Sequence, residues 1–211
     1  AMPGYDVQVL SEDGKEVGPG ILGAISIKLP LPPGSLPTLW NADDRYIESY
    51  LSTFPGYYET GDAGYQDEDG YLYIMSRTDD VINVAGHRLS TGAMEEAVSN
   101  HIDVAECAVI GVLDNLKGQV PLGLVCLNNG CNKPDEVICK EIIDLVRTEI
   151  GPVAAFKSVA VVSALPKTRS GKILRATIRK IADNVDWEMP ATVDNPLVFD
   201  EIKKAIKPLG Y

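Results

Sequence analysis

The sequence has few histidines, few bulky aromatic rings and no long apolar run. Of its 211 residues only 2 are histidine, 2 are tryptophan and 3 are phenylalanine. No stretch approaches the roughly 18 uninterrupted apolar residues that a membrane-spanning helix needs. No charged and then apolar segment at the N-terminus indicates a secretory signal. With 45% hydrophobic and 23% charged residues, the sequence predicts a globular protein of one domain or two small ones.

Positive charge is scarce. The chain has 19 lysine and arginine residues against 30 aspartate and glutamate residues, which gives a formal net charge of −11 at pH 7. Proteins that bind nucleic acid need an excess of basic side chains to displace the counterions of the phosphate backbone. The charge balance therefore argues against nucleic acid as a partner.

Closely spaced cysteine pairs are missing too. The four cysteines, Cys107, Cys126, Cys131 and Cys139, form no CxxC motif, and with so few histidines we expect no structural zinc site and no other metal site in the chain itself. Unpaired cysteines are typical of reducing compartments. We therefore expect an intracellular protein, in the cytoplasm or the mitochondrial matrix.

The first part of the chain, up to about residue 78, has the pattern of β structure. Alternating apolar and polar residues predict strands at 25–29, 57–65 and 71–75. The prolines within 30–38 lack the N–H donor that a sheet ladder needs, so an ordered loop is expected there. The last two strands are separated by turn residues and should form a hairpin.

After residue 80 the pattern changes to alternating helices and strands. Continuous apolar runs at 108–113 and 122–127 are typical of buried strands, and the spacing after Pro134 predicts an amphipathic helix. Residues 83–88 are interpreted as a loop, and the residues after the last helix as a polar tail. The elements are helix, strand, strand, helix, strand and helix, starting near residues 91, 108, 122, 134, 159 and 173. The fold class predicted is α/β (α+β), with a β subdomain ahead of a compact α/β domain.

Two short stretches have the residue types of a phosphate or nucleotide site. Residues 165–182 contain six basic residues and no acid, and within them a glycine and a serine precede Lys172, which suits either a bulky anion or a solvated basic helix face. Asp62 follows a glycine near a strand end, where a carboxylate can accept hydrogen bonds from sugar hydroxyls or can simply belong to a turn. The residues alone leave both alternatives open.

Four longer motifs resemble one family, the acyl-CoA synthetases of the adenylate-forming superfamily. They are YYETGD (57–62), SRTDDVINVAGHRLS (76–90), IGPVAAF (150–156) and LPKTRSGKI (165–173). The chain is most similar to the short-chain branch, the acetyl-CoA and propionyl-CoA synthetases. KLPLPPGSLPTLW (28–40) followed by FPGYY (54–58) favours the propionate-preferring members.

The resemblance implies where the chain belongs within such an enzyme. The family enzymes are far longer than 211 residues, and their phosphate loop and acyl pocket are absent here. The chain is therefore expected to be a C-terminal portion. Residues 1–78 would be a piece of the β-barrel subdomain of the large AMP-binding domain, and 79–211 the small mobile C-terminal domain, with the hinge near Asp79.

The resemblance also implies roles for single residues. Asp62 and Arg77 match residues that hold the AMP ribose, and Arg88 matches an arginine at the AMP phosphate. Gly86 matches a glycine that lines the pantetheine tunnel of CoA, beside Ala85. Many acetate enzymes of the family have serine at the position of Ala85, so a hydrogen bond to CoA from that side chain is missing here.

Lys172 matches the catalytic lysine of the family. Its ammonium would neutralise charge as an acid oxygen attacks the α-phosphate of ATP. The same lysine is often a target of reversible acylation, so lysine-acylating and deacylating enzymes are expected partners.

The implied reaction joins a short-chain carboxylate, acetate or propionate, to coenzyme A. ATP and the acid give acyl-AMP and pyrophosphate with Mg²⁺, which would be bound mainly outside this chain. The small domain then rotates, and CoA displaces AMP. The fragment alone is expected to be inactive. Two alternatives stay open: another adenylate-forming ligase for medium-chain or aryl acids, and a non-enzymatic standalone C-terminal module.

Overall fold

The computed structural model describes residues 1–78 and 80–211 and divides the chain into two compact units. The first unit is Ala1–Asp79 and the second is Asp80–Tyr211. The predicted hinge residue Asp79 lies outside the described residues. What the two units are within a longer enzyme stays a prediction.

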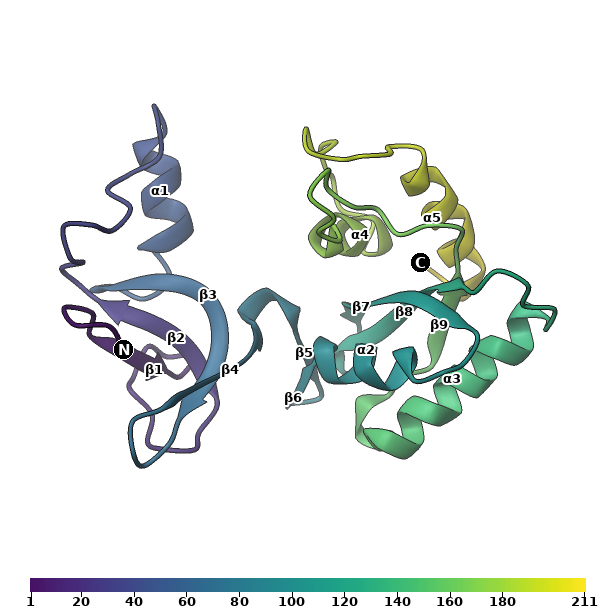
Figure 1. The fold of residues 1–211 in the computed structure, drawn as a ribbon, viewed down its shortest axis with the longest axis horizontal. Coiled ribbons are helices and arrows are strands. Elements are labelled where there is room, and N and C mark those ends of the chain that lie inside the picture. Colours follow the sequence, from purple (N-terminus) through teal and green to yellow (C-terminus); the bar gives the residue numbers. More distant parts are fainter. The chain divides into compact units, whose positions relative to one another are not determined.

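The first unit is an open antiparallel sheet with one helix against it (Figure 1). The strands follow one another in the order β1-β2-β3-β4, so β1 and β4 are free edges and the described sheet is not a closed barrel. The elements are β1 (Val7–Leu10), β2 (Gly23–Lys28), α1 (Asp43–Tyr50), β3 (Tyr57–Gln66) and β4 (Leu72–Arg77).

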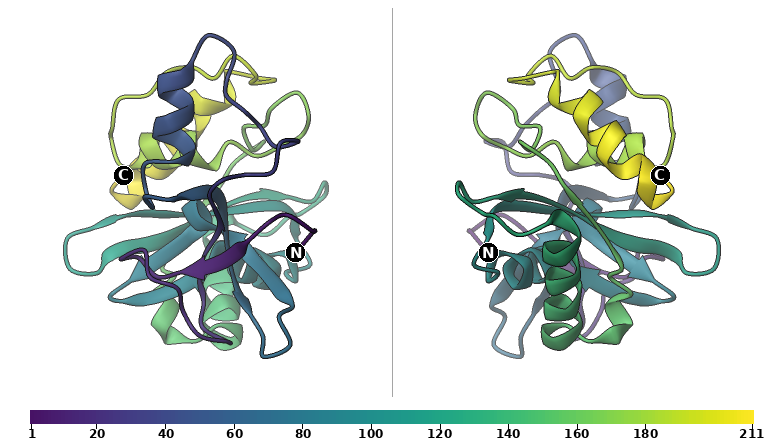
Figure 2. Two further views of the ribbon diagram at one scale, coloured as in Figure 1. Left: turned by 90° about the vertical axis from the view of Figure 1, so that its left-hand side faces the viewer. Right: turned by 90° about the vertical axis from the view of Figure 1, so that its right-hand side faces the viewer.

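The second unit has a central sheet with helices on both faces. The strand order is β6-β5-β8-β7, and β9 pairs with β8 in parallel. Figure 1 and Figure 2 show α2 and α3 on one face of this sheet and α4 and α5 on the other. The elements are β5 (Val81–Val84), β6 (His87–Ser90), α2 (Thr91–Ser99), β7 (Val104–Asp114), β8 (Gly118–Leu127), α3 (Asp135–Glu149), the 3-10 turn Pro152–Ala154, β9 (Ser158–Val161), α4 (Arg175–Ala182), α5 (Val198–Ile206) and the 3-10 turn Lys207–Leu209.

Two buried clusters hold the second unit together, one on each face of the sheet. Leu122 and Leu124 point to the face covered by α4 and α5, where they pack near Ile178 and Phe199. Val125 points to the opposite face, among residues of α2 and α3. Because side chains of a strand alternate between faces, the continuous apolar run in β8 supplies both clusters at once.

The α/β fold class is confirmed, and three local predictions need correction. Residues 83–88 are not a loop but most of the β5–β6 hairpin. The strand β5 forms because its side chains Ile82 and Val84 are buried in the core. The supposed polar tail contains α5, whose Val198, Phe199 and Ile202 recur at helical spacing and are buried. The helix α1 was not predicted at all. None of the helices in the described part of the chain has the length and apolar composition that a membrane crossing needs.

Candidate functional site

Asp62 and Arg77 are neighbours across two strands of the first unit. They face each other in the register of β3 and β4, and Arg77 Nη1 lies 3.4 Å from Asp62 Oδ1. The side chains are 35% and 52% exposed, so this ion pair contributes at most about 1 kcal/mol to the free energy of unfolding. The two residues that the resemblance assigns to the ribose are thus brought together and stay accessible.

Gly61 makes the approach of Arg77 possible. A side chain at this position would overlap the guanidinium of Arg77, and the backbone has φ +77, which disfavours other residues. Next to it, the Thr60 hydroxyl donates to Ile25 O at 2.6 Å and accepts from Asp62 N at 3.1 Å. The register of β2 and β3 shifts at this point. The bulge therefore fixes where Asp62 is presented.

Ala85 and Gly86 form the two-residue turn of the β5–β6 hairpin. Their φ angles of 50 and 89 are both positive, the combination that a type I′ turn requires. The Ala85 N–H donates to Lys117 O at 2.8 Å. Among the described residues, other than Gly86 and its two neighbours in the chain, no atom lies within 4 Å of the place where a Cβ on Gly86 would be, so the tip of the hairpin is open.

The neighbouring hairpin β7–β8 supports this turn. Gly86 N donates to Asn83 Oδ1 at 3.0 Å, and Asn83 N in turn donates to Gln119 Oε1 on β8 at 2.9 Å. Arg88 lies opposite Asn83 on β6 and is partly buried. The predicted CoA residues thus lie in a turn whose backbone is held by the side chains of Asn83 and Gln119, for which the sequence predicted no role.

Lys172 lies in a tight hairpin, residues 166–174, which we call the Lys172 loop. Thr168 N donates to Lys172 O at 2.8 Å, and the Thr168 hydroxyl accepts from Lys172 N at 3.1 Å. Gly171 turns the chain with φ +86 and donates its N–H to Thr168 O. Leu174 N donates to Pro166 O at 2.9 Å. The loop is ordered by its own hydrogen bonds, while the Lys172 side chain is exposed.

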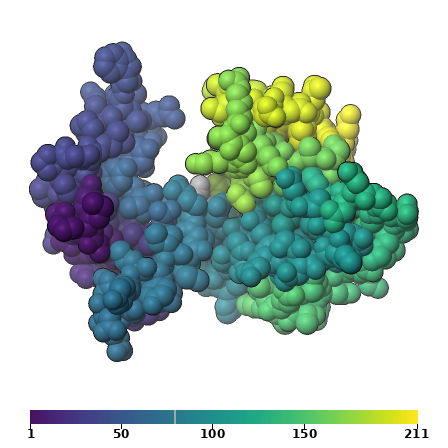
Figure 3. Space-filling view, in the orientation of Figure 1, coloured from purple at the N-terminus to yellow at the C-terminus, as the bar shows by residue number. Residues whose placement is uncertain are grey.

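A second segment braces the loop from outside. Arg169 N donates to Thr192 O at 3.0 Å, and Asp194 N donates to Lys167 O at 2.9 Å. Figure 3 shows the Lys172 loop, in light green, at the surface of the second unit. The stretch after α4, which the sequence analysis treated as a tail, therefore helps to hold the predicted catalytic loop.

Of the six cations in 165–182, two are neutralised within the chain. Lys167 Nζ lies 2.5 Å from Glu106 Oε1, and Arg175 Nη2 lies 2.8 Å from Glu95 Oε2. Four others have side chains without a hydrogen bond or ion pair among the described residues: Arg169, Lys172, Arg179 and Lys180. Positive charge without an internal partner, next to a glycine turn, is suited to an anionic ligand.

One group of possible metal ligands lies elsewhere in the second unit, and it does not fit Mg²⁺. His101, Asp103 and Glu141 come together, but Lys133 Nζ already lies 3.0 Å from Asp103 Oδ2 and 2.8 Å from Glu141 Oε2. An ammonium thus stands where a cation would bind. Hydrogen bonds from Lys133 and His101 lower the pKa of Glu141, and those carboxylates raise the pKa of Lys133 to about 12.

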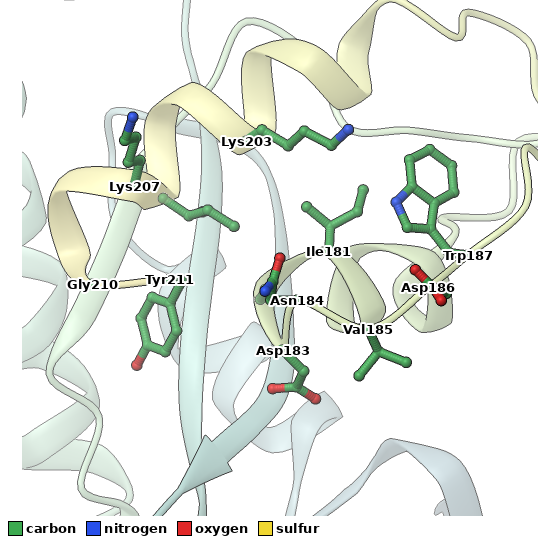
Figure 4. Close-up of a pocket in the computed structure, with 12 residues that line it drawn as sticks. Ile181, Asp183, Asn184, Val185, Asp186, Trp187, Lys203, Lys207, Gly210 and Tyr211 are labelled. Carbon is green, nitrogen blue, oxygen red and sulfur yellow. The ribbon is translucent and has the colours of Figure 1, made fainter.

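A pocket of about 680 Å³ lies beyond the C-terminal end of α4. In Figure 4, the Lys203 side chain extends toward Trp187, and its ammonium lies 5.3 Å from the Trp187 ring centroid. Asp183, Lys207 and Tyr211 also line the pocket. None of the predicted site residues lines this pocket.

Comparison with known proteins finds related sequences and structures. Residues 93–172 match the AMP-binding enzyme C-terminal domain, and Lys172 is the last residue matched. The chain is 58% identical to an uncharacterised protein of Pseudomonas aeruginosa over 98% of the chain and 33% of that protein. It is 48% identical to mouse acyl-CoA synthetase short-chain family member 3, mitochondrial, over 98% of the chain and 30% of that protein.

The structure of acetoacetyl-CoA synthetase from Streptomyces lividans is similar in fold. Its TM-score is 0.79 at 22% identity, over 98% of this chain and 31% of that one. At this identity the likeness shows the fold alone. The chain spans about a third of the length of the curated relatives it matches. Residues 93–172 are thus similar to the AMP-binding enzyme C-terminal domain, and over nearly its whole length the chain is homologous to about a third of the length of the short-chain acyl-CoA synthetases of the adenylate-forming superfamily.

Proposed function

We propose that this chain is part of an AMP-forming acid–thiol ligase that joins acetate or propionate to coenzyme A. The observation that carries the proposal is the ammonium of Lys172, which is unpaired among the described residues. It stands on an ordered hairpin inside a domain of the matching family. A preorganised, unneutralised cation is what the transfer of a nucleotidyl group to a carboxylate requires.

In the first half-reaction, a carboxylate oxygen of the acid attacks the α-phosphorus of ATP. The bond to the bridging oxygen of pyrophosphate breaks, and acyl-AMP forms. Lys172 would stabilise the negative charge shared by the attacking oxygen and the phosphate. Asp62 would accept hydrogen bonds from the ribose hydroxyls, because its Oδ1 has only a long contact to Arg77 and the pair is exposed.

In the second half-reaction, the sulfur of CoA attacks the acyl carbon. The acyl–oxygen bond to AMP breaks, and the thiol proton is lost to solvent. The pantetheine arm would pass the tip of the β5–β6 hairpin, where Gly86 presents backbone without a side chain. Arg88, on the same hairpin, would contact the AMP phosphate. Exchange between the two half-reactions would use the predicted hinge at Asp79. No residue of this chain is assigned to Mg²⁺.

The proposed function is tested on the longer protein, with acetate, propionate and butyrate as acids. We expect AMP and acyl-CoA in equal amounts, with the highest kcat/KM for acetate or propionate. The isolated 211 residues should give ATP–pyrophosphate exchange at background. Preference for a medium-chain or aryl acid would contradict the substrate assignment. If no acid gives acyl-AMP, the ligase function is contradicted and the non-enzymatic binding module is favoured.

The same exposure makes Lys172 a proposed site of reversible acylation. Acylation removes the positive charge, so the modified longer protein should lose acyl-AMP formation and regain it on deacylation. Mass spectrometry of the loop peptide, followed alongside activity, measures both. An acylated Lys172 with full activity would contradict its assigned role. We propose an intracellular location, in keeping with the reaction.

A further inference from the structure

The Lys172 loop leads into α4, and the start of α4 has little support of its own. Leu174, at the N-cap, makes no side-chain hydrogen bond, and the first turn contains no acidic residue. It contains instead a cation, Arg175, at the helix end where the dipole disfavours positive charge. A basic residue in this place needs a partner from outside the helix.

That partner is Glu95 on α2, 80 positions earlier in the chain. Arg175 Nε donates to Glu95 Oε1 at 3.0 Å, and Arg175 Nη2 donates to Glu95 Oε2 at 2.8 Å. The side chains are only 28% and 19% exposed. Two parallel hydrogen bonds between planar groups fix orientation as well as distance. By comparison, the Lys167–Glu106 contact on the other side of the loop is single and more exposed.

Glu95 also accepts a hydrogen bond from the free edge of the sheet. The strand β7 pairs only with β8 among the described residues, so it presents N–H groups outward. Glu95 Oε1 accepts one of them, from Val109 at 2.9 Å. Because α2 and α4 cover opposite faces of the sheet (Figure 1), the carboxylate reaches around the edge and joins both helix layers to β7.

The other end of α4 is held in a related way. Asp183, the C-cap residue, accepts a hydrogen bond from Leu113 N on the same edge at 2.8 Å. The helix that carries the Lys172 loop is therefore attached to β7 at both ends by carboxylates. Only the attachment at Glu95 lies next to the loop, since Arg175 is three residues from Lys172.

We propose that Glu95 is a positioning residue for adenylation, acting through Arg175 to hold the Lys172 loop at a fixed place on the small domain. Glu95 does not touch the reacting atoms in this account. The inference rests on the proposed function of Lys172. It predicts that loss of the bidentate contact moves the lysine without removing it, and that the Gly86 hairpin, which is held by Asn83 and Gln119, is unaffected.

The kinetic test uses Glu95→Gln in the longer protein. Glutamine keeps the size and an acceptor for Val109 but removes the charge. Acyl-AMP formation should fall about 10- to 100-fold, the range expected from a misplacement of about 1 Å. KM for ATP should stay within about twofold, and thioester formation from supplied acyl-AMP within about threefold. Arg175→Lys keeps the positive charge but loses the guanidinium that makes two parallel hydrogen bonds. Its rate of acyl-AMP formation should lie between those of Glu95→Gln and wild type.

The matched control is Glu141→Gln, the same change in another ion pair of the second unit, away from the loop. It should leave both half-reactions at wild-type rates. The positioning role is contradicted if Glu95→Gln behaves like this control. It is equally contradicted if Glu95→Gln slows both half-reactions alike, since that is the effect of a weakened fold.

A second measurement does not depend on the activity. Hydrogen exchange on the 211-residue chain should show Gly171 and Lys172 amides exchanging at least about tenfold faster in Glu95→Gln, with the β7–β8 ladder unchanged. Unchanged loop exchange would overturn the inference. If the longer wild-type protein forms no acyl-AMP, the proposed function fails, and exchange still decides whether Glu95 holds the loop.

Discussion

The two units present their predicted site residues on very different supports. In the first unit, Asp62 and Arg77 stand on an open sheet, and the unit has a small buried cluster of Leu10, Ala24 and Phe54 with four further buried apolar residues, Val9, Ile25, Tyr46 and Ala63. In the second unit, the Gly86 hairpin is part of a sheet buried on both faces, under clusters of 16 and 15 residues, and the Lys172 loop connects the last strand of that sheet to α4. A loop on a well-packed core keeps its position, whereas a side-chain pair on an open sheet depends on whatever covers that sheet.

Exposed apolar residues follow the same division. In the first unit the edge strand β4 has Ile74 at 67% and Met75 at 54% exposure, and Tyr71 just before it is 69% exposed. An edge strand with exposed apolar side chains is usually covered in the protein's working state. Since the relatives are about three times longer than this chain, the first unit is the part whose stability we expect to depend on residues outside it.

The largest expected difference is therefore in independent folding. Residues 80–211 expressed alone should unfold in one cooperative urea transition, because their core is complete. Residues 1–79 alone should show none, because a small open sheet buries too little apolar surface. Circular dichroism and amide chemical-shift dispersion measure both. A cooperative transition in the first piece would break the comparison.

The next largest effect is expected at Gly86. In the longer protein, Gly86→Leu should lower thioester formation about a hundredfold or more and leave acyl-AMP formation near wild type, because leucine would fill the path proposed for pantetheine. Gly86→Ala is the matched control, since it has the same unfavourable positive φ and little bulk. If Gly86→Ala slows thioester formation as much as Gly86→Leu does, the effect comes from backbone strain. If Gly86→Leu slows both half-reactions equally, the assignment of Gly86 to the pantetheine tunnel is contradicted.

A smaller effect is expected from the ion-pair cluster around Glu141 of α3. The pKa of Glu141 is lowered in the folded state by Lys133 and His101, so its contribution to stability is present above the unfolded pKa and is lost as pH falls through the folded one. Lys133→Gln should therefore lower the thermal midpoint slightly at neutral pH and make no difference at about pH 2. Melting curves of the 211-residue chain between pH 2 and 7 measure this. A difference that persists at the lowest pH would contradict the ionic origin.

Periodicity predicted the core well and the supports of the site poorly. The runs in β7 and β8 and the apolar stripe of α3 were found because burial imposes period 2 or 3.6 on the sequence. The helix α5 was missed because the segment contains exposed charged residues, such as Lys203 and Lys204, between its buried apolar residues, and its composition was taken as that of a polar tail. The β5–β6 hairpin was missed because its turn is Ala-Gly, and only the positive φ of Ala85 reveals the turn type.

The candidate site also combines residues that the sequence predicted with supporting residues that it did not. Asp62, Gly86 and Lys172 are predicted from motifs, and the structure gives them accessible positions. Some of the supporting contacts are local, such as those of Asn83 with Gly86 and of Thr168 with Lys172, but others join residues far apart in the sequence and were not predictable. Glu95 meets Arg175 over 80 positions, and Gln119 reaches Asn83 over 36. Such pairs follow from sheet order and helix placement, which single-sequence patterns do not specify.

In the proposed function, Lys172 and the Gly86 hairpin serve different half-reactions from one compact unit. The most direct measurement is a pair of single-turnover rates for Lys172→Ala in the longer protein: ATP with the acid, and supplied acyl-AMP with CoA. Acyl-AMP formation should fall about a hundred- to a thousandfold, corresponding to roughly 3–4 kcal/mol of lost transition-state stabilisation, while thioester formation stays within a few-fold of wild type. Equal loss of both rates, with unchanged thermal stability, would contradict the account.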